Sequence, residues 1–296
     1  MTRTILITAI APLSWGTTYL VTSELLPPGR PLLAAVLRAL PAGLLLLAIT
    51  RTLPRGAWWW KSAVLGALNI GVFFALLFIA AYRLPGGVAA TMGAIQPLVV
   101  ALLASRLVGE AITLRRIIAG VAGIGGVALL VLQAQARLDV IGVIAALGGT
   151  VSMALGAVLS KRWGRPASGL AVTSWQLIAG GVVLVPVLLL VEGLPTEPPT
   201  TTNLLGYAYL TLVGTALAYA LWFRGIERLP VTSVSFLGLL SPVVAVLVGF
   251  IVLHQTLSIG QLVGVVVVLG ALAVVFAARP VLSSSAEGSQ SVGARR

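Results

Sequence analysis

The sequence predicts an all-α membrane protein in which ten transmembrane helices form two inverted five-helix repeats. Three observations carry this prediction. Hydrophobic residues make up 59% of the 296 residues and charged residues only 9%, against roughly 45–50% and 25% in soluble domains. The chain contains ten apolar segments, each near the ~20 residues that a helix needs to cross a bilayer. The two halves of the chain also align with each other at a nearly constant offset.

The ten expected spans are apolar runs bounded by Arg, Pro and Gly. In chain order they cover residues 4–24, 32–50, 62–81, 87–106, 114–132, 140–160, 170–191, 204–223, 232–252 and 258–278. The first is interpreted as an uncleaved helix, since Pro12, Trp15 and Tyr19 interrupt its apolar run and nine spans follow it. Pro97 and Pro242 are expected to have structural roles inside their spans, where freed carbonyl groups need other partners.

The positive charges predict how the chain lies in the membrane. The net charge is +12, and fifteen of the nineteen lysines and arginines fall in alternate loops and termini on one side of the ten-span arrangement. Only Arg30, Arg83 and Arg137 are expected on the other side, while Arg38 lies within a span. Because basic loops are retained in the cytoplasm, both termini are expected there, with the protein in the cell membrane. The charge therefore requires no nucleic-acid partner.

The internal repeat divides the chain into two expected domains. Several groups align at offsets from 145 down to 138 residues, namely Arg83-Leu84-Pro85 with Arg228-Leu229-Pro230, Pro97 with Pro242, Gly16 with Gly156, and Arg38 with Gln176. Because five spans is an odd number, the second half enters the membrane from the opposite side, as in secondary transporters. We expect one repeat in residues 1–135, the other in 136–279, and a disordered cytoplasmic tail in 280–296.

The residue types argue against enzymatic chemistry. The chain has no cysteine and a single histidine, His254, so thiolate metal sites and His-based triads are excluded or nearly so. No Asp or Glu falls in the central third of any span, although acid–base catalysis or metal ligation would need such groups in a cluster. We expect no enzyme activity, no cofactor and no metal. The same lack of a buried carboxylate favours facilitated diffusion or exchange over proton-driven transport.

Short motifs in both halves resemble a known family. They are Leu13-Ser14-Trp15-Gly16, Arg38, Gln96-Pro97-Leu98 followed by Glu110, and Ser241-Pro242 followed by Gln255. Over residues 4–278 the chain is similar to EamA-like transporters of the drug/metabolite transporter (DMT) superfamily, although that family often carries Glu where this chain has Gln255. The resemblance implies a ten-helix bundle with a central cavity lined by spans one, three, four, six, eight and nine. It also implies transport of amino acids or other small metabolites, commonly as export.

Polar and aromatic residues at mid-membrane depth are candidates for binding the substrate. They are Trp15, Thr18, Tyr19, Arg38, Asn69, Phe73, Phe74, Met92, Gln96, Ser152, Tyr219, Trp222, Ser235 and Ser241. Each alone is more typical of helix packing, but all except Arg38 fall on the spans that the resemblance nominates. Asn69 and Gln96 are the preferred candidates, because an amide in hydrocarbon needs partners that a wet cavity supplies.

Three charged residues need separate interpretations. An arginine inside a span costs about 2.5–3.5 kcal/mol on insertion scales, so Arg38 requires compensation. Either a structural ion pair with Glu24 provides it, or Arg38 attracts a substrate carboxylate or phosphate. Glu110 is expected to be structural, pairing with neighbouring arginines and complementing the N-terminus of the fifth helix.

These expectations favour an inner-membrane exporter or facilitator of small polar metabolites such as amino acids, working by alternating access between the two repeats. The alternative is a non-transporting structural or accessory membrane protein, which would show the repeat without a solvent-accessible cavity. The expected partners are a small-molecule substrate and the lipid bilayer. Glycines in spans five and ten let helices approach closely, and form either an internal scaffold, the preferred interpretation, or a homodimer face.

Overall fold

A computed structural model gives the fold, and it describes residues 2–83, 91–131, 139–195 and 197–277. The elements in these ranges are α-helices and two π-helical turns. Nine helical segments there are long and apolar enough to cross a membrane, and Thr91–Leu107 is a shorter apolar helix in the place of a tenth. The expected all-α fold with ten crossings is therefore confirmed. The predicted tail in 280–296 lies outside the described residues.

The first half of the chain makes crossings one to five. They consist of α1 (Thr2–Gly16) with α2 (Thr18–Leu25); α3 (Pro31–Thr50); α4 (Trp58–Gly66), η1 (Ala67–Gly71) and α5 (Val72–Arg83); Thr91–Leu107, which includes α7 (Gln96–Leu107); and α8 (Leu114–Val131). The observed limits agree with the expected spans to within a few residues.

The second half makes crossings six to ten. They consist of α9 (Val140–Trp163); α10 (Gly169–Val191); α11 (Thr201–Thr211), η2 (Leu212–Leu217) and α12 (Ala218–Arg228); α13 (Val231–Leu237) with α14 (Leu240–Val252); and α15 (Ile259–Phe276). Polar side chains cap the starts of four of these helices. Asp139, Ser168, Thr200 and Ser258 each accept a hydrogen bond from a backbone N–H in the first turn, which satisfies a donor that the helix itself leaves free.

The two prolines lie within crossings four and nine, as expected, and each stands at the start of a helical segment. A turn at residues 94–95 precedes α7, so Pro97 occupies its second position, and a turn at 238–239 precedes α14, which contains Pro242 in its first turn. Proline is tolerated there because the first N–H groups of a helix have no intrahelical acceptor. Crossings four and nine are thus broken at corresponding places, and the prolines begin the second segment of each.

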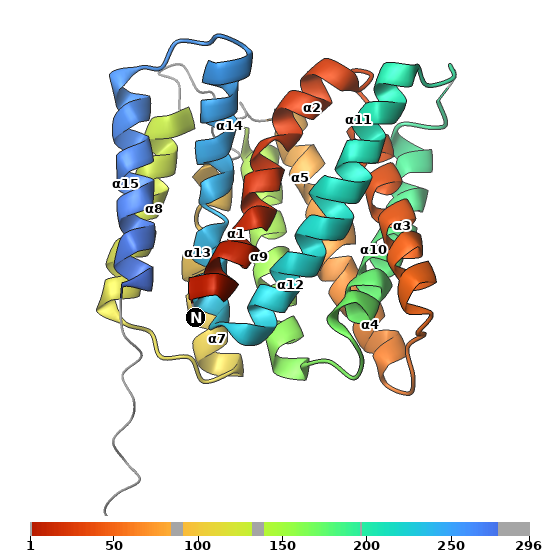
Figure 1. The fold of residues 1–296 in the computed structure, drawn as a ribbon, viewed down its shortest axis with the longest axis horizontal. Helices are drawn as coiled ribbons and strands as arrows, with labels where there is room; N and C mark the ends of the chain where they lie inside the picture. The colour runs from red at the N-terminus through yellow and green to blue at the C-terminus, as the bar shows by residue number, and fades with distance from the viewer. Residues whose placement is uncertain (1, 84–90, 132–138, 196, 278–296) are drawn as a thin grey trace, which may run out of the picture.

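The crossings are arranged around a central group. In Figure 1, α8 and α15 pack side by side at one edge of the bundle, and α3 and α10 pack together toward the other edge. Crossings one, four, six and nine lie between these pairs in this view, and crossings three and eight pack against α3 and α10. We call these six crossings the central group. The start of α1 and the end of α15 lie on the same face, at the bottom of Figure 1. We call this the terminal face, and the other end of the bundle the opposite face.

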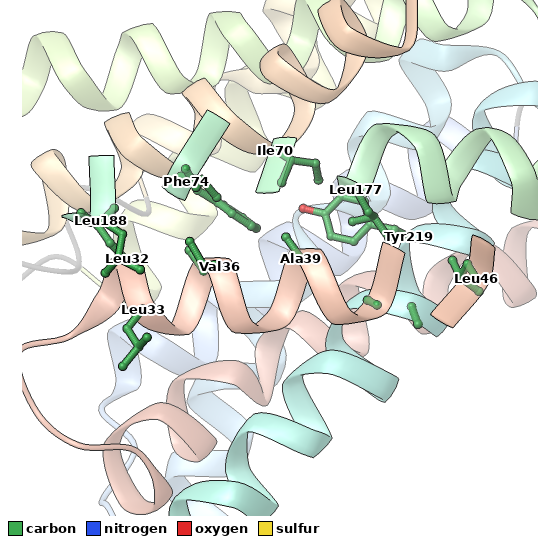
Figure 2. Close-up of a cluster of buried hydrophobic side chains, with 14 residues drawn as sticks. Leu32, Leu33, Val36, Ala39, Leu46, Ile70, Phe74, Leu177, Leu188 and Tyr219 are labelled. Carbon is green, nitrogen blue, oxygen red and sulfur yellow. The ribbon is translucent and has the colours of Figure 1, made fainter. Parts of the chain in front are cut away.

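One buried hydrophobic cluster joins α3 to its neighbours. Figure 2 shows Leu32, Val36 and Ala39 along one side of α3, facing Ile70 and Phe74 of crossing three, Leu177 and Leu188 of α10, and Tyr219 of α12. Glycines allow these helices to approach closely. A Cβ at Gly66 or Gly180 would overlap atoms of the facing helix. This packing fixes α3, and with it Arg38, against crossing eight.

Candidate functional site

Crossings three and eight each contain a π-helical turn at the same position in the repeat. The turns η1 and η2 begin at Ala67 and Leu212, and 212 − 67 = 145 is the offset that aligns the two halves. Val72 donates its N–H to Ala67, five residues back, and Ala218 donates to Val213 and Thr215. The carbonyls of Leu68 and Gly214 therefore lose their usual donor four residues later and are free to accept other hydrogen bonds.

The freed carbonyl in η2 binds two side chains from the first half. The Gly214 oxygen accepts hydrogen bonds from Arg38 Nη2 at 2.8 Å and from Trp15 Nε1 at 3.1 Å. Arg38 Nε also donates to Thr215 Oγ1 at 2.8 Å. The guanidinium carbon lies 5.3 Å from the centre of the Phe74 ring, within the range of a cation–π interaction. The turn thus joins crossings one, two and eight around the arginine.

No carboxylate neutralises Arg38 among the described residues. The expected ion pair with Glu24 is not formed, because Glu24 is exposed and accepts a hydrogen bond from Ser23. The partners of Arg38 are neutral oxygens and an aromatic ring, and in the described part of the chain no acceptor is found for its third nitrogen, Nη1. The described partners of this guanidinium, at the eighth position of the twenty-residue helix α3, are therefore all neutral.

Aromatic residues surround this arginine. The Trp15 ring lies 5.2 Å from Tyr219 and 5.1 Å from Trp222, measured between ring centroids. We call Trp15, Thr18, Arg38, Phe74, Gly214, Thr215, Tyr219 and Trp222 the Arg38 cluster. Thr18 belongs to it because a Cβ on Gly214 would lie 3.9 Å from Thr18 Oγ1 and 3.6 Å from Arg38 Nη2. The hydroxyl of Thr18 is buried and has no hydrogen-bond partner among the described residues.

In the other π turn, η1, the freed carbonyl and the neighbouring amide both bind protein side chains. The Leu68 oxygen accepts a hydrogen bond from Ser152 Oγ at 2.9 Å, and Asn69 Nδ2 donates to Gln176 Oε1 at 2.8 Å. Both amides are almost fully buried, with 2% of Asn69 and 1% of Gln176 exposed. Asn69 Nδ2 also lies 3.4 Å from Ser160 Oγ, so its amide is bound by protein side chains in this structure, and its place in a wet cavity stays a prediction.

The remaining candidates are spread over crossings three, four and nine. Gln96 Nε2 is buried without a partner in the described residues. Ser235 Oγ donates to Thr232 within α13, and Phe73 packs against Phe74 with ring centroids 5.5 Å apart. The backbone oxygen of Met92 accepts from Thr150 Oγ1 at 3.4 Å. Ser241 is partly exposed, and the side chain of Tyr19 lies outside the described part of the structure.

Glu110 contacts a different helix from the expected one. Its carboxylate accepts hydrogen bonds from the N–H groups of Val231 at 2.6 Å and Thr232 at 3.3 Å, at the start of α13. It also pairs with Arg116 at 3.8 Å, as the sequence predicts. The helix N-terminus that it complements therefore belongs to crossing nine and not to crossing five. Glu110 thus ties the two halves together at the terminal face.

Buried side chains seal the terminal half of the central group. Crossings one, four, six, eight and nine all contribute to one cluster, which we call the terminal-side cluster. Its members are Ala11, Val100, Ala104, Ala154, Ala157, Val158, Ala218, Trp222, Ile226, Leu229, Val231, Val234 and Leu237. In the opposite half, the α3 cluster of Figure 2 includes Leu32, Phe74 and Leu188, and two smaller clusters lie beside it. Val21, Leu26, Ala34, Tyr207 and Leu210 form one, and Ala80, Ala145 and Ala146 form another.

Two of the cavities in the described part of the structure lie near its two faces. A cavity of about 500 Å³ opens between α3, α5 and α10 near the opposite face, with Arg30 and Glu192 among its lining residues. A smaller one of about 140 Å³ lies between α1 and α12 at the terminal face. Neither is lined by any of the fourteen sequence candidates, so the central cavity stays a prediction.

Three residues are missing from the fourteen sequence candidates. Gly214 and Thr215 accept the hydrogen bonds of Arg38, and Gln176 holds the equivalent position to Arg38 in the second half. A signal was present in the repeat. At the offset of 145 residues Asn69 aligns with Gly214, and Gln176 aligns with Arg38 at 138. The freed carbonyl is a backbone group, however, and the residue type does not show where it occurs. The alignment alone therefore does not select these positions.

Comparison with known proteins agrees with this architecture. Residues 2–132 and 140–277 each match the EamA-like transporter family, which indicates a duplicated repeat. The protein is similar to Protein PecM of Dickeya dadantii, with 51% identity covering 90% of this chain and 89% of PecM. It is 30% identical to the uncharacterized inner membrane transporter YedA of Escherichia coli K12, with 91% of each chain covered. A Streptantibioticus cattleyicolor protein named as a probable terminal-alkyne amino-acid exporter is 30% identical over 65% of each chain.

A solved crystal structure supports the fold. It superposes with a TM-score of 0.82 and covers 94% of this chain and 97% of the other, at 22% sequence identity. At that identity the likeness concerns the fold alone. The family match, by contrast, spans nearly the whole chain in two copies. This protein is a multi-pass membrane protein that belongs to the EamA-like transporter family.

Proposed function

We propose that the protein exports small polar metabolites of the amino-acid class across the inner membrane by alternating access. The observation that carries the proposal is the Arg38 cluster. Within the described ranges it places a guanidinium without a counter-ion beside a threonine hydroxyl without a hydrogen-bond partner. Arg38 is the eighth residue of α3, about 10 Å from the start of that helix at 1.5 Å per residue. A substrate carboxylate at this depth would find a charged donor that water does not screen.

The uneven packing of the central group supports the mechanism. Its terminal half is sealed by the terminal-side cluster, while the buried residues described in its opposite half fall into the α3 cluster of Figure 2 and two smaller clusters. Since basic loops predict a cytoplasmic terminal face, the seal would close the cytoplasmic side. Rocking of residues 1–135 against 136–279 would separate the helices of the terminal-side cluster and bring the helices together at the opposite face. Inverted repeats move in this way in other secondary transporters.

The amino-acid class has two supports. Arg38 favours a ligand with a negative group, and the aromatic rings of Trp15 and Tyr219 offer apolar surface next to it. The exporter from Streptantibioticus cattleyicolor provides a relative whose name gives an amino-acid substrate. We infer facilitated or exchange transport, because no Asp or Glu lies in the central third of a crossing to relay protons.

The direct test is flux through purified protein in proteoliposomes. Vesicles are loaded with a panel of labelled zwitterionic, anionic and cationic metabolites, and their release is measured with and without a pH gradient. We expect release of zwitterionic or anionic amino acids down their gradient, accelerated by substrate on the other side. Uphill accumulation driven by protons would contradict the facilitator assignment. Release no faster than from protein-free vesicles for every compound would favour the accessory role.

A further inference from the structure

The cavity at the terminal face is lined by three arginines. Arg3 comes from the first turn of α1, and Arg224 and Arg228 lie one helical turn apart on α12. Thr4, Ile7 and Thr8 complete the lining. Its volume of about 140 Å³ is far above the ~10–15 Å³ that a single water requires. The cavity is therefore large enough for a small anionic group.

The positive charge of this cavity is not compensated by protein carboxylates. In the described ranges Arg3, Arg224 and Arg228 make no ion pair. The acidic residue between the last two along the chain is Glu227, and its carboxylate is bound by Arg165 at 2.9 Å. Three like charges around one cavity repel one another, so an anion bound among them would be stabilised by all three.

The cavity lies where the two halves of the chain meet. A Cβ at Gly225 of α12 would overlap the Thr8 side chain of α1, so these helices touch directly at that level. The cavity lining begins at Thr8 and runs to Arg3, toward the terminal face. A ligand here would contact α1 and α12 together, and both helices also contribute residues to the terminal-side cluster.

We propose that this cavity binds a phosphate group, either the phosphodiester of an anionic lipid or free phosphate. Guanidinium groups bind phosphate oxygens through paired hydrogen bonds, and basic pockets between transmembrane helices bind anionic lipid headgroups. By bridging α1 and α12, the bound phosphate stabilises the closed terminal face. This inference depends on the cavity alone and not on the transported substrate.

Thermal unfolding of the full chain in nanodiscs tests the proposal, with the seven tryptophans as the fluorescent probe. The unfolding midpoint is measured in pure phosphatidylcholine, in phosphatidylcholine mixed with phosphatidylglycerol, and in phosphatidylcholine with added inorganic phosphate against chloride of equal ionic strength. Three proteins are compared: the wild type, R224Q/R228Q, and R106Q/R115Q. The last removes the same charge from exposed arginines of the terminal face outside the cavity.

We expect phosphatidylglycerol to raise the midpoint of the wild type and of R106Q/R115Q, and R224Q/R228Q to lose most of that rise. Retention of phosphatidylglycerol in native mass spectrometry should fall about fivefold per arginine removed. A rise with inorganic phosphate, lost in the same variant, would support the proposal with soluble phosphate as the source. If R224Q/R228Q does not fold, the same midpoints are measured for R3Q, which changes an exposed residue of the cavity lining. No rise with either compound, or equal loss in R106Q/R115Q, would overturn it.

Discussion

Arg38 and Gln176 hold equivalent positions in the two halves, and each reaches the π-helical turn of the other half. Arg38 donates to Gly214 and Thr215 in η2, while Gln176 accepts from Asn69 in η1. The two contacts have the same place in the fold but differ in charge. Only Arg38 is a cation, so the two equivalent positions make one charged contact and one neutral contact.

Arg38→Gln should separate transport from folding. Glutamine can keep a neutral hydrogen bond to η2, as Gln176 does in the other half, so the folded yield should stay near that of the wild type. Loss of the charged hydrogen bond to substrate should lower flux about 10- to 100-fold, from the ~1.5–3 kcal/mol of such bonds. Proteoliposome flux per folded molecule measures this. R106Q, on the exposed end of α7, serves as the control, and undiminished flux in Arg38→Gln would refute a substrate role.

Glu110→Gln should lower stability more than transport. The carboxylate complements the N-terminus of α13 and pairs with Arg116, an arrangement typically worth up to about 2 kcal/mol. We expect a lower unfolding midpoint and folded yield, with nearly normal flux per folded molecule. Glu197→Gln, at an exposed loop position, is the matched control. Normal yield with abolished flux would instead assign Glu110 to the transport cycle.

Gly225→Ala should force α1 and α12 apart. The added methyl group would overlap Thr8, whose side chain packs directly over the glycine, and such overpacking typically costs about 1–3 kcal/mol. Gly125→Ala is the control, because a Cβ there meets nothing within 4 Å. Adding Thr8→Gly should restore much of the unfolding midpoint that Gly225→Ala loses. If Thr8→Gly does not raise the unfolding midpoint of the Gly225→Ala protein, overlap with Thr8 is not the cause of the destabilisation.

Asn69 and Gln176 should behave as one unit. Asn69→Leu leaves the buried Gln176 amide without its partner, and Gln176→Met leaves Asn69 only the longer bond to Ser160 Oγ at 3.4 Å. Loss of a buried partner costs about 1–3 kcal/mol, while replacing both amides with apolar groups is expected to be much less harmful. The unfolding midpoints of the two single variants and the double variant measure this coupling. Additive losses would show that each amide has another partner.

Single cysteines can test the predicted sidedness, because the chain has no native cysteine. Thr202→Cys lies in the exposed first turn of α11 at the opposite face, and Arg55→Cys lies in an exposed loop at the terminal face. A membrane-impermeant maleimide applied to spheroplasts should label Thr202→Cys only, and Arg55→Cys should react after lysis. The reverse pattern would place the termini outside the cytoplasm.

The crossings were predictable because they depend on composition over about twenty residues. The span expected at 32–50 is observed as Pro31–Thr50, and that at 140–160 as Val140–Trp163. The contacts of the site were not predictable in the same way. Arg38 binds a carbonyl 176 residues away, and Glu110 binds backbone groups more than a hundred residues later. Residue type gives the depth of a side chain but not the helix that it faces.

The paired π turns also bear on the ancestry of the chain. A π turn places one more residue in a turn than an α-helix does, so its simplest origin is a one-residue insertion. Two independent insertions would rarely arise at matching points of crossings three and eight. The shared position of η1 and η2 is what we expect if the π turn was already present in one five-helix unit before that unit was duplicated. Such a unit would assemble as two copies in opposite orientations, whereas in this chain only one half carries the arginine that binds the π turn of the other.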